Sequence, residues 1–169
     1  ERWPEKNLWP GDAAARARSL AVRTVEAIGG VGIFGIEMFL TGSGELLVNE
    51  VAPRTHNSGH YTIEACATDQ FEQHLRAVLG LPLGSPELLS PAAMINLLGA
   101  PGHSGRPLIK GMAAALAIPR VRVHIYRQAA SKHYRKMGHV TVLDRDIGEA
   151  RRKAERVRAL LEITGEDHP

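Results

Sequence analysis

Residues 35–60 read GIEMFLTGSGELLVNEVAPRTHNSGH. Apolar and other side chains alternate from Gly35 to Leu40, a Gly-rich run at 41–44 interrupts the alternation, and it resumes from Leu46 to Val51. A period of two is typical of a half-buried strand, and a short Gly-rich interruption between two such runs is typical of a hairpin turn. The sequence therefore predicts two antiparallel strands joined by a tight turn.

This hairpin places two carboxylates on one face of the sheet. With Gly42-Ser43 as a two-residue turn, Glu37 faces Val48, and Glu37 and Glu50 become diagonal neighbours whose Cβ atoms lie roughly 7 Å apart. Both acids are flanked by apolar residues, so burial would penalise them unless a cation neutralised their charge. Oxygen ligands without cysteine or clustered histidine favour Mg²⁺ or Mn²⁺ over zinc. The alternative is a solvated face with two surface acids, and a register slip of one residue would separate them.

The segment after the second strand concentrates polar side chains. Within residues 49–60 the chain carries one arginine, two histidines, two asparagines, one glutamate and one serine, just before a predicted helix. A cation, several hydrogen-bond donors and a helix N-terminus form a surface that suits phosphate or another oxyanion. The alternative is a loop whose polar groups only satisfy its own backbone.

The rest of the chain alternates between helical and strand-like patterns. We expect a helix that Asp12 caps and Gly29-Gly30 ends, and a second helix from about Thr62 to Leu79. A connector rich in Pro, Gly and Ser follows at 81–91. The remaining predicted elements are strands near 93–98, 121–125 and 139–143 and a closing helix after the capping-box pattern Asp146-x-x-Glu149.

Composition excludes several classes of protein. The 169 residues suffice for one domain or two small ones, and no run approaches the roughly 20 apolar residues that a membrane crossing needs. The basic run at 151–158 has helical spacing and is typical of a solvated helix face. With 5% aromatic residues, the sequence argues against nucleic-acid binding. The single cysteine, Cys66, fits a small buried residue in a reducing cytoplasm. The start without Met indicates a piece of a longer protein.

Several blocks, occurring in a fixed order, resemble one known family. They are residues 35–39, 49–60, 70–78, 81–84, 94–99 and 135–141, and they include the runs HNSGH and RKMGH. Together they resemble the carboxy-terminal half of the 5-(carboxyamino)imidazole ribonucleotide synthetases, ATP-grasp ligases of purine biosynthesis that carboxylate 5-aminoimidazole ribonucleotide. Related ATP-grasp enzymes, such as formate-dependent glycinamide ribonucleotide transformylase, share the two-glutamate hairpin but match HNSGH and RKMGH less well.

The resemblance implies an α+β fold in two parts. Residues 1–90 would be the carboxy-terminal part of an ATP-grasp domain, and residues 91–169 a small carboxy-terminal β-rich domain with a closing helix. It also implies a cytoplasmic enzyme that uses ATP, bicarbonate and 5-aminoimidazole ribonucleotide and that forms a homodimer when intact. The adenine pocket and the phosphate loop would belong to a missing amino-terminal part of the same chain, so we expect the isolated chain to be inactive.

The resemblance also assigns roles in the hairpin and its loop. Glu37 and Glu50 match the family's Mg²⁺ ligands, and Asn49 with Glu50 matches its ATP-contacting pair. Arg54 and His56 match groups near bicarbonate and carboxyphosphate, which makes them the candidate catalytic residues.

Four further residues match substrate-binding positions of the family. Asn57 and Ser58 lie in the same substrate loop, while Arg135, with Lys136 beside it, matches a residue that grips the ribonucleotide phosphate. For the other histidines considered, His60, His103, His124 and His168, we expect structural roles.

The chain departs from the family at one phosphate-binding position. The family usually has Tyr-Gly-Lys ahead of the RKMGH block, and this chain has Tyr126-Arg127-Gln128. An amide in place of an ammonium group removes a charge-assisted contact unless Arg127 or Lys132 replaces it. This departure keeps two alternatives open: a non-catalytic remnant that binds phosphate or a partner protein, and an ATP-grasp enzyme that acts on a different purine intermediate.

Overall fold

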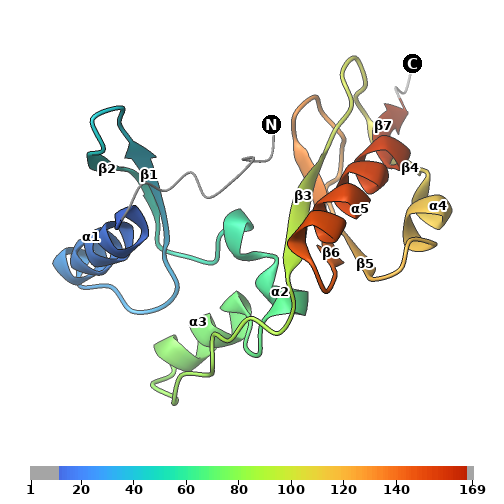
Figure 1. Ribbon diagram of the computed structural model, residues 1–169. Helices are drawn as coiled ribbons and strands as arrows, with labels where there is room; N and C mark the ends of the chain where they lie inside the picture. Colours follow the sequence, from blue (N-terminus) through green and yellow to red (C-terminus); the bar gives the residue numbers. More distant parts are fainter. Residues whose placement is uncertain (1–11, 167–169) are drawn as a thin grey trace. The chain divides into compact units, whose positions relative to one another are not determined.

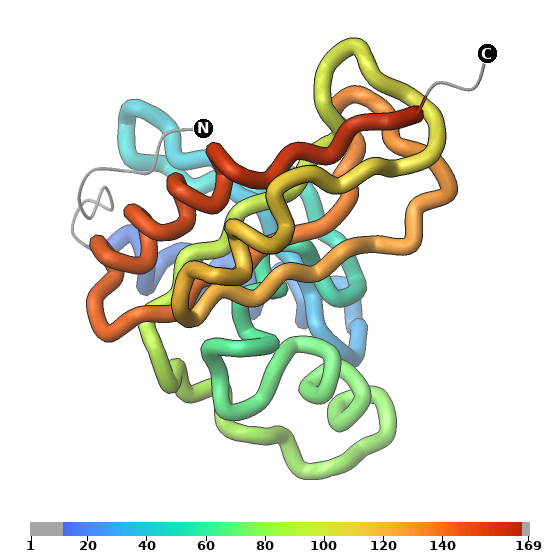
Figure 2. The backbone as a smooth tube through the Cα atoms, turned by 90° about the vertical axis from the view of Figure 1, so that its right-hand side faces the viewer, coloured from blue at the N-terminus to red at the C-terminus, as the bar shows by residue number. Residues whose placement is uncertain are grey.

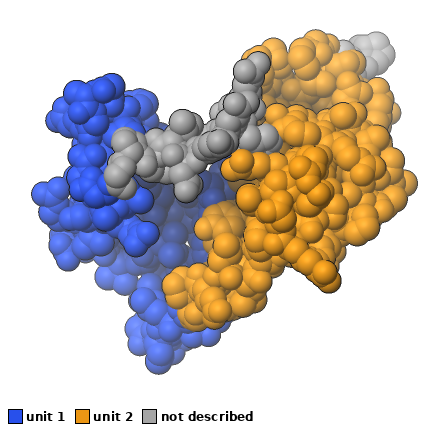
Figure 3. Space-filling model, viewed as in Figure 1, with its two compact units in different colours: residues 1–59, 70–84 blue, residues 60–69, 85–169 orange. Residues whose placement is uncertain are grey.

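The computed structural model describes residues 12–166, which form a mixed arrangement of helices and strands in two compact units. Figure 3 shows the units in different colours. Within the described residues, unit 1 comprises 12–59 and 70–84, and unit 2 comprises 60–69 and 85–166. The mixed α+β prediction is confirmed. The units do not follow the predicted domain boundary after residue 90, because residues 60–69 and 85–90 lie in unit 2. Compact units are not the same as domains, so that boundary stays a prediction.

Unit 1 contains helix α1 (Ala13–Ile28), the hairpin of strands β1 (Gly35–Leu40) and β2 (Leu46–Ala52), the 3₁₀ turn η1 (Asn57–Gly59) and helix α3 (Gln70–Val78) (Figure 1). Helix α1 ends where Gly29 adopts a left-handed conformation with φ of 68°, as its Gly-Gly ending predicts. Asp12 precedes α1 without a side-chain cap hydrogen bond. Its carboxylate pairs instead with Arg16 at 3.0 Å.

The prediction of one helix from Thr62 to Leu79 is wrong. Helix α2 (Thr62–Ala65) ends at Cys66, whose backbone is extended, and α3 begins only at Gln70. The connector causes the break, because it pairs with this segment in a strand-like manner: the N–H of residue 67 donates to the carbonyl of Glu87 at 2.9 Å, and the N–H of Leu89 donates to the carbonyl of residue 65 at 2.7 Å. A backbone that forms these bonds cannot continue an α-helix.

Unit 2 is built on a three-stranded antiparallel sheet in the order β3 (Ala92–Leu98), β6 (Lys136–Leu143), β5 (Val121–Ile125). The predicted strands are therefore confirmed. Helix α5 (Ile147–Leu160) packs on β3 and β6 (Figure 1). The fully or almost fully buried apolar side chains of this unit include Ile95, Val140, Val142 and Val157.

Helix α5 begins as its sequence predicts. The Asp146 side chain accepts hydrogen bonds from the backbone N–H groups of Gly148 at 2.9 Å and Glu149 at 3.1 Å. The basic residues of α5 lie mostly at the surface, and several pair with acids: Arg152 with Glu149, and Lys153 with Asp144 at 2.6 Å. This is the solvated helix face that the charge pattern predicts.

Three elements of unit 2 were not predicted: strand β4 (Arg106–Lys110), helix α4 (Met112–Leu116) and strand β7 (Glu162–Glu166). Strand β7 follows α5 and pairs antiparallel with β4, so the helix does not close the described chain. Figure 2 shows β7, in red, running beside β4, in yellow. No helix within residues 12–166 is long and apolar enough to cross a membrane.

Candidate functional site

The hairpin of unit 1 has a different register from the predicted one. Five residues, not two, separate the strands, because Leu40 pairs with Leu46. Further along, the register shifts again: Met38 pairs with Val48, and Glu37 pairs with Glu50, so Asn49 is an extra residue in β2. Such a β-bulge lets two residues of one strand oppose a single residue of the other.

The two register shifts bring Glu37 and Glu50 directly opposite each other. Each one-residue shift alone would move Glu50 to the other face, but together they restore the shared face and replace the predicted diagonal by a direct pair. Directly opposed residues of an antiparallel pair have Cβ atoms about 4.5–5.5 Å apart, closer than the roughly 7 Å expected for a diagonal. The turn and the bulge together thus replace the predicted diagonal pair by a directly opposed one.

The carboxylate face is exposed to solvent. The side chain of Glu37 is 51% exposed, neighbouring Phe39 is 60% exposed, and Asn49 and Glu50 are exposed as well. The expectation that buried apolar neighbours desolvate these acids is wrong for this chain, and the solvated-face alternative describes it. Exposure does not oppose ion binding, since Mg²⁺ usually keeps several waters and takes one or two carboxylates plus phosphate oxygens.

The donor set fits such an ion only with help from a ligand. No cluster of three or more His, Cys, Asp or Glu side chains arranged for a metal ion occurs in residues 12–166. Glu37 and Glu50 would therefore supply two oxygen donors, and water and phosphate would supply the others. This composition is typical of nucleotide-dependent magnesium sites.

His56 lies beside this carboxylate pair. Its Nε2 is 3.5 Å from an oxygen of Glu37, and its side chain is 16% exposed. Its Nδ1 lies 2.8 Å from the hydroxyl oxygen of Ser58 and accepts the backbone N–H of Ser58 at 3.4 Å. An accepting Nδ1 in a neutral ring leaves the proton on Nε2, which therefore faces the carboxylate.

Gly35 allows His56 to approach β1. A Cβ atom at Gly35 would lie 2.7 Å from both Cβ and Cγ of His56, so any larger residue would displace the imidazole. The predicted loop residues Asn57 and Ser58 continue from His56 into η1. Arg54 is exposed, and its guanidinium donates to the carbonyl of Thr55 at 3.0 Å. One segment of unit 1 thus carries all seven predicted residues from Glu37 to Ser58.

Arg135 and Lys136 belong to unit 2. The Arg135 guanidinium donates to the carbonyl of Ala130 at 3.2 Å. The backbone carbonyl of Arg135 accepts the N–H of Gly99 at 2.9 Å. Lys136 is exposed and is the first residue of β6. Gln128 is half-buried, and its N–H donates to the carbonyl of Tyr126 at 2.8 Å. These residues therefore belong to a different compact unit from the predicted residues between Glu37 and Ser58.

Unit 2 also contains a histidine stack, which sequence reasoning missed. The ring of His139 stacks on His124 at a centroid distance of 4.4 Å and on His60 at 4.7 Å. Tyr126 joins His139 through its hydroxyl, 2.9 Å from Nδ1, and Glu64 joins His124, with 2.5 Å between Oε1 and Nε2. One feature of the sequence could have indicated this stack: His60 and His139 are the last residues of the two runs HNSGH and RKMGH. His103 is exposed, and His168 lies outside the described residues.

His139 is 2% exposed and is held in its neutral form. Burial, reinforced by His124 and His60, lowers its pKa from the ordinary 6.5 to about 4. Between these two values the unfolded chain binds a proton that the folded chain does not, so stability falls as the pH is lowered from 6.5 towards 4. At about 1.4 kcal/mol per pKa unit, the loss from this residue amounts to about 3 kcal/mol.

We therefore expect His139→Phe, which keeps an aromatic ring but cannot take up a proton, to flatten the decline of the unfolding free energy between pH 6.5 and 4. Urea unfolding of the 169-residue chain at several pH values measures this decline. His103→Phe, at an exposed position, serves as the control and should keep the original slope. The hydrogen bond from Lys153 lowers the pKa of Asp144, so the stabilising contribution of this carboxylate is lost at the acidic end. This loss is common to the parent chain and both variants. If the unfolding free energy of His139→Phe and of the parent chain declined equally between pH 6.5 and 4, the decline would not come from His139.

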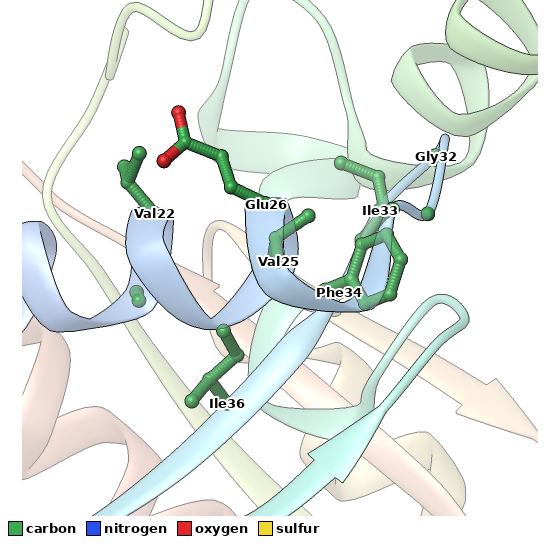
Figure 4. Close-up of a pocket in the computed structure, with 10 residues that line it drawn as sticks. Val22, Val25, Glu26, Gly32, Ile33, Phe34 and Ile36 are labelled. Carbon is green, nitrogen blue, oxygen red and sulfur yellow. The ribbon is translucent and has the colours of Figure 1, made fainter.

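An apolar groove of about 580 Å³ lies elsewhere in unit 1. It runs along the last turns of α1 and the segment that leads into β1, and Figure 4 shows Val25, Ile33, Phe34 and Ile36 around it, with Glu26 as the charged side chain among the labelled residues. None of the predicted site residues lines it. The candidate site is therefore the exposed hairpin face and its loop.

Two family models match the chain. The ATP-grasp domain matches residues 4–71, and the phosphoribosylaminoimidazole carboxylase C-terminal domain matches residues 92–153. Among curated relatives, N5-carboxyaminoimidazole ribonucleotide synthase of Bacillus subtilis is 48% identical over 128 residues, which cover 76% of this chain and 32% of the relative. The chloroplastic phosphoribosylaminoimidazole carboxylase of Vigna aconitifolia is 47% identical over 141 residues, 79% of this chain and 25% of the relative.

Solved structures of N5-carboxyaminoimidazole ribonucleotide synthetases also match this chain. N5-carboxyaminoimidazole ribonucleotide synthetase from Thermotoga maritima matches with a TM-score of 0.85 and 55% identity, over 98% of this chain and 44% of that chain. The Aspergillus clavatus synthase in complex with ADP and 5-aminoimidazole ribonucleotide matches with a TM-score of 0.74 and 39% identity, over 86% of this chain and 39% of that chain. The chain thus spans about a quarter to a third of these curated relatives and less than half of these solved chains.

Proposed function

We propose that this chain, which belongs to the ATP-grasp family of N5-carboxyaminoimidazole ribonucleotide synthetases, is the carboxy-terminal portion of a ligase that carboxylates 5-aminoimidazole ribonucleotide with ATP and bicarbonate in purine biosynthesis. The observation that carries the proposal is the direct opposition of Glu37 and Glu50 with the His56 imidazole 3.5 Å from Glu37. Carboxylates for a cation and an imidazole beside them suit phosphoryl transfer next to a small oxyanion.

The proposed chemistry begins with activation of bicarbonate. Bicarbonate is a poor electrophile, so one of its oxygens first attacks the γ-phosphorus of ATP, which gives carboxyphosphate and ADP. The exocyclic amine of 5-aminoimidazole ribonucleotide then forms a C–N bond to the carboxyl carbon, directly or after release of carbon dioxide. Phosphate leaves, and the amine loses a proton. The reaction places negative charge on the carboxyphosphate, and a guanidinium is well suited to bind it.

Arg54 and His56 are proposed to serve these steps. The exposed guanidinium of Arg54 would bind the carboxyphosphate oxygens. His56 would position the reacting carboxylate or accept the proton of the amine, because a ring nitrogen of a neutral imidazole can accept a proton. Asn57 and Ser58 would contact the substrate, and the hydroxyl of Ser58 fixes the imidazole through Nδ1.

Glu37 and Glu50 are proposed to hold Mg²⁺ or Mn²⁺, with Asn49 and Glu50 also at the nucleotide. The ion, when bound, would offset the negative charge of the β- and γ-phosphates. Asn49 is the extra residue of the bulge and is exposed beside Glu50, which leaves its side chain open to ATP.

Arg135 and Lys136 are proposed to bind the phosphate of the ribonucleotide. Gln128, in place of the family's lysine, cannot make the same charge-assisted contact, so Arg127 or Lys132 would have to supply it. This substitution favours a second candidate function, a non-catalytic remnant that binds phosphate or a partner protein. It also leaves room for an ATP-grasp enzyme with another purine intermediate.

Phosphate release by the full-length protein that contains this chain separates these candidates. For the proposed ligase we expect release from ATP that requires both bicarbonate and 5-aminoimidazole ribonucleotide. A protein that binds ATP but releases no phosphate under these conditions would be the remnant, and one that responds to formate with glycinamide ribonucleotide would be the transformylase. We also propose that the intact enzyme is a cytoplasmic homodimer, and light scattering coupled to gel filtration measures its mass.

A further inference from the structure

Helix α3 holds the loop of the candidate site through one amide. Gln70, the first residue of α3, is 5% exposed, and its carboxamide forms two hydrogen bonds with the backbone of His56. Its Oε1 accepts the N–H of His56 at 2.9 Å, and its Nε2 donates to the carbonyl of His56 at 2.9 Å. The backbone N–H and the backbone carbonyl of His56 are thus both held by a side chain 14 positions away.

The imidazole of His56 is confined from several sides. On one side, Gly35 offers no side chain and the ring lies where its Cβ would be. The Gln70 amide that holds the His56 backbone is itself packed against Gly59, since a Cβ there would lie 2.5 Å from Oε1 and 2.8 Å from Cδ. With Nδ1 at Ser58 and Nε2 at Glu37, the ring has a defined position and a defined tautomer.

From these contacts we infer that Gln70 is the positioning residue for His56. This inference rests on the proposed function for its catalytic consequence, but its structural part stands on the two hydrogen bonds alone. An amide is required because the site needs one acceptor and one donor at the same time. An ionised carboxylate can only accept, and an alkyl side chain can do neither. A shift of about 1 Å in a reacting group can cost on the order of 100-fold in rate.

The same helix offers a matched control. Gln73 clamps a different backbone, that of Gly84, in the same way: its Nε2 donates to the carbonyl at 2.7 Å and its Oε1 accepts the N–H at 2.8 Å. Gly84 belongs to the connector and not to the loop at His56. Loss of this clamp therefore tests the effect of loosening α3 without touching His56.

The experiment compares Gln70→Leu, Gln70→Glu and Gln73→Leu in the full-length protein with the unmodified protein. One readout is the nitrogen NMR spectrum of histidine-labelled protein, which reports the tautomer of His56. The other is kcat and KM for ribonucleotide-dependent phosphate release. We expect both Gln70 variants to lose the single-tautomer signal and to lower kcat about 10- to 100-fold with a smaller change in KM for ATP, while Gln73→Leu changes neither.

Two results would overturn the inference. One is a His56 signal and a kcat that Gln70→Leu and Gln70→Glu leave within twofold of the unmodified protein. The other is a loss in Gln73→Leu equal to that in Gln70→Leu, which would mean that general loosening of α3 is responsible. If the unmodified protein releases no phosphate but only the Gln70 variants alter the His56 signal, the positioning role holds and the proposed function fails.

Discussion

Glu50→Gln in the full-length protein is expected to lower ribonucleotide-dependent phosphate release by at least about 100-fold, because the proposed function makes Glu50 a charged metal ligand whose loss weakens charge stabilisation at the transferring phosphoryl group. The substitution keeps the size of the side chain and its place opposite Glu37. Binding of Mn²⁺ in the presence of ADP should weaken in parallel, which calorimetry measures independently of turnover. Glu37→Gln should have the same two effects.

Glu45→Gln is the matched control for this prediction. Glu45 is an exposed acid of the same hairpin, but it lies in the turn, away from the opposed pair. The control removes the same charge from the same hairpin, so we expect Mn²⁺ binding and turnover close to those of the unmodified protein. If Glu37→Gln and Glu50→Gln bind Mn²⁺ with ADP as tightly as Glu45→Gln does, these glutamates are not the metal ligands.

Gly111→Ala is expected to cause a large loss of stability in unit 2. Gly111 joins β4 to α4 and has a left-handed backbone with φ of 78°. A Cβ atom there would overlap the carbonyl oxygen of Leu160 at the end of α5, which is backbone and cannot rotate away. The conformational penalty of about 1–2 kcal/mol and the overpacking penalty of about 1–3 kcal/mol together give a loss of about 3 kcal/mol in the free energy of unfolding.

Gly102→Ala separates the two contributions. Gly102 also has a left-handed backbone, with φ of 74°, but apart from its two chain neighbours no heavy atom of residues 12–166 lies within 4 Å of its hypothetical Cβ. This variant should therefore show only the conformational penalty of about 1–2 kcal/mol. Urea unfolding of both variants provides the measurement. Equal losses in the two proteins would mean that the contact with the end of α5 contributes nothing.

Local sequence predicted several elements because their determinants are local. Helix α1 ends at the Gly29 that its Gly-Gly signal marks, and Asp146 caps α5 through two backbone N–H groups. In contrast, the apolar spacing between Thr62 and Leu79 suggested one helix where two exist. Pairing of residues 65–67 with 87–89, about 20 positions away, overrides that spacing. Strands β4 and β7 were missed for the same reason, since each is defined by the other.

The sequence by itself determined the hairpin, the polar loop after it and the set of candidate residues from Glu37 to Ser58. Side-chain identity and a period of two are enough for that. Only the tertiary structure decided how these residues meet. A five-residue turn and a bulge at Asn49 together preserve the face and bring Glu37 opposite Glu50, while the backbone of His56 is fixed by Gln70. Periodicity specifies which face a residue occupies, but register and loop position depend on hydrogen bonds between distant segments, which no local pattern encodes.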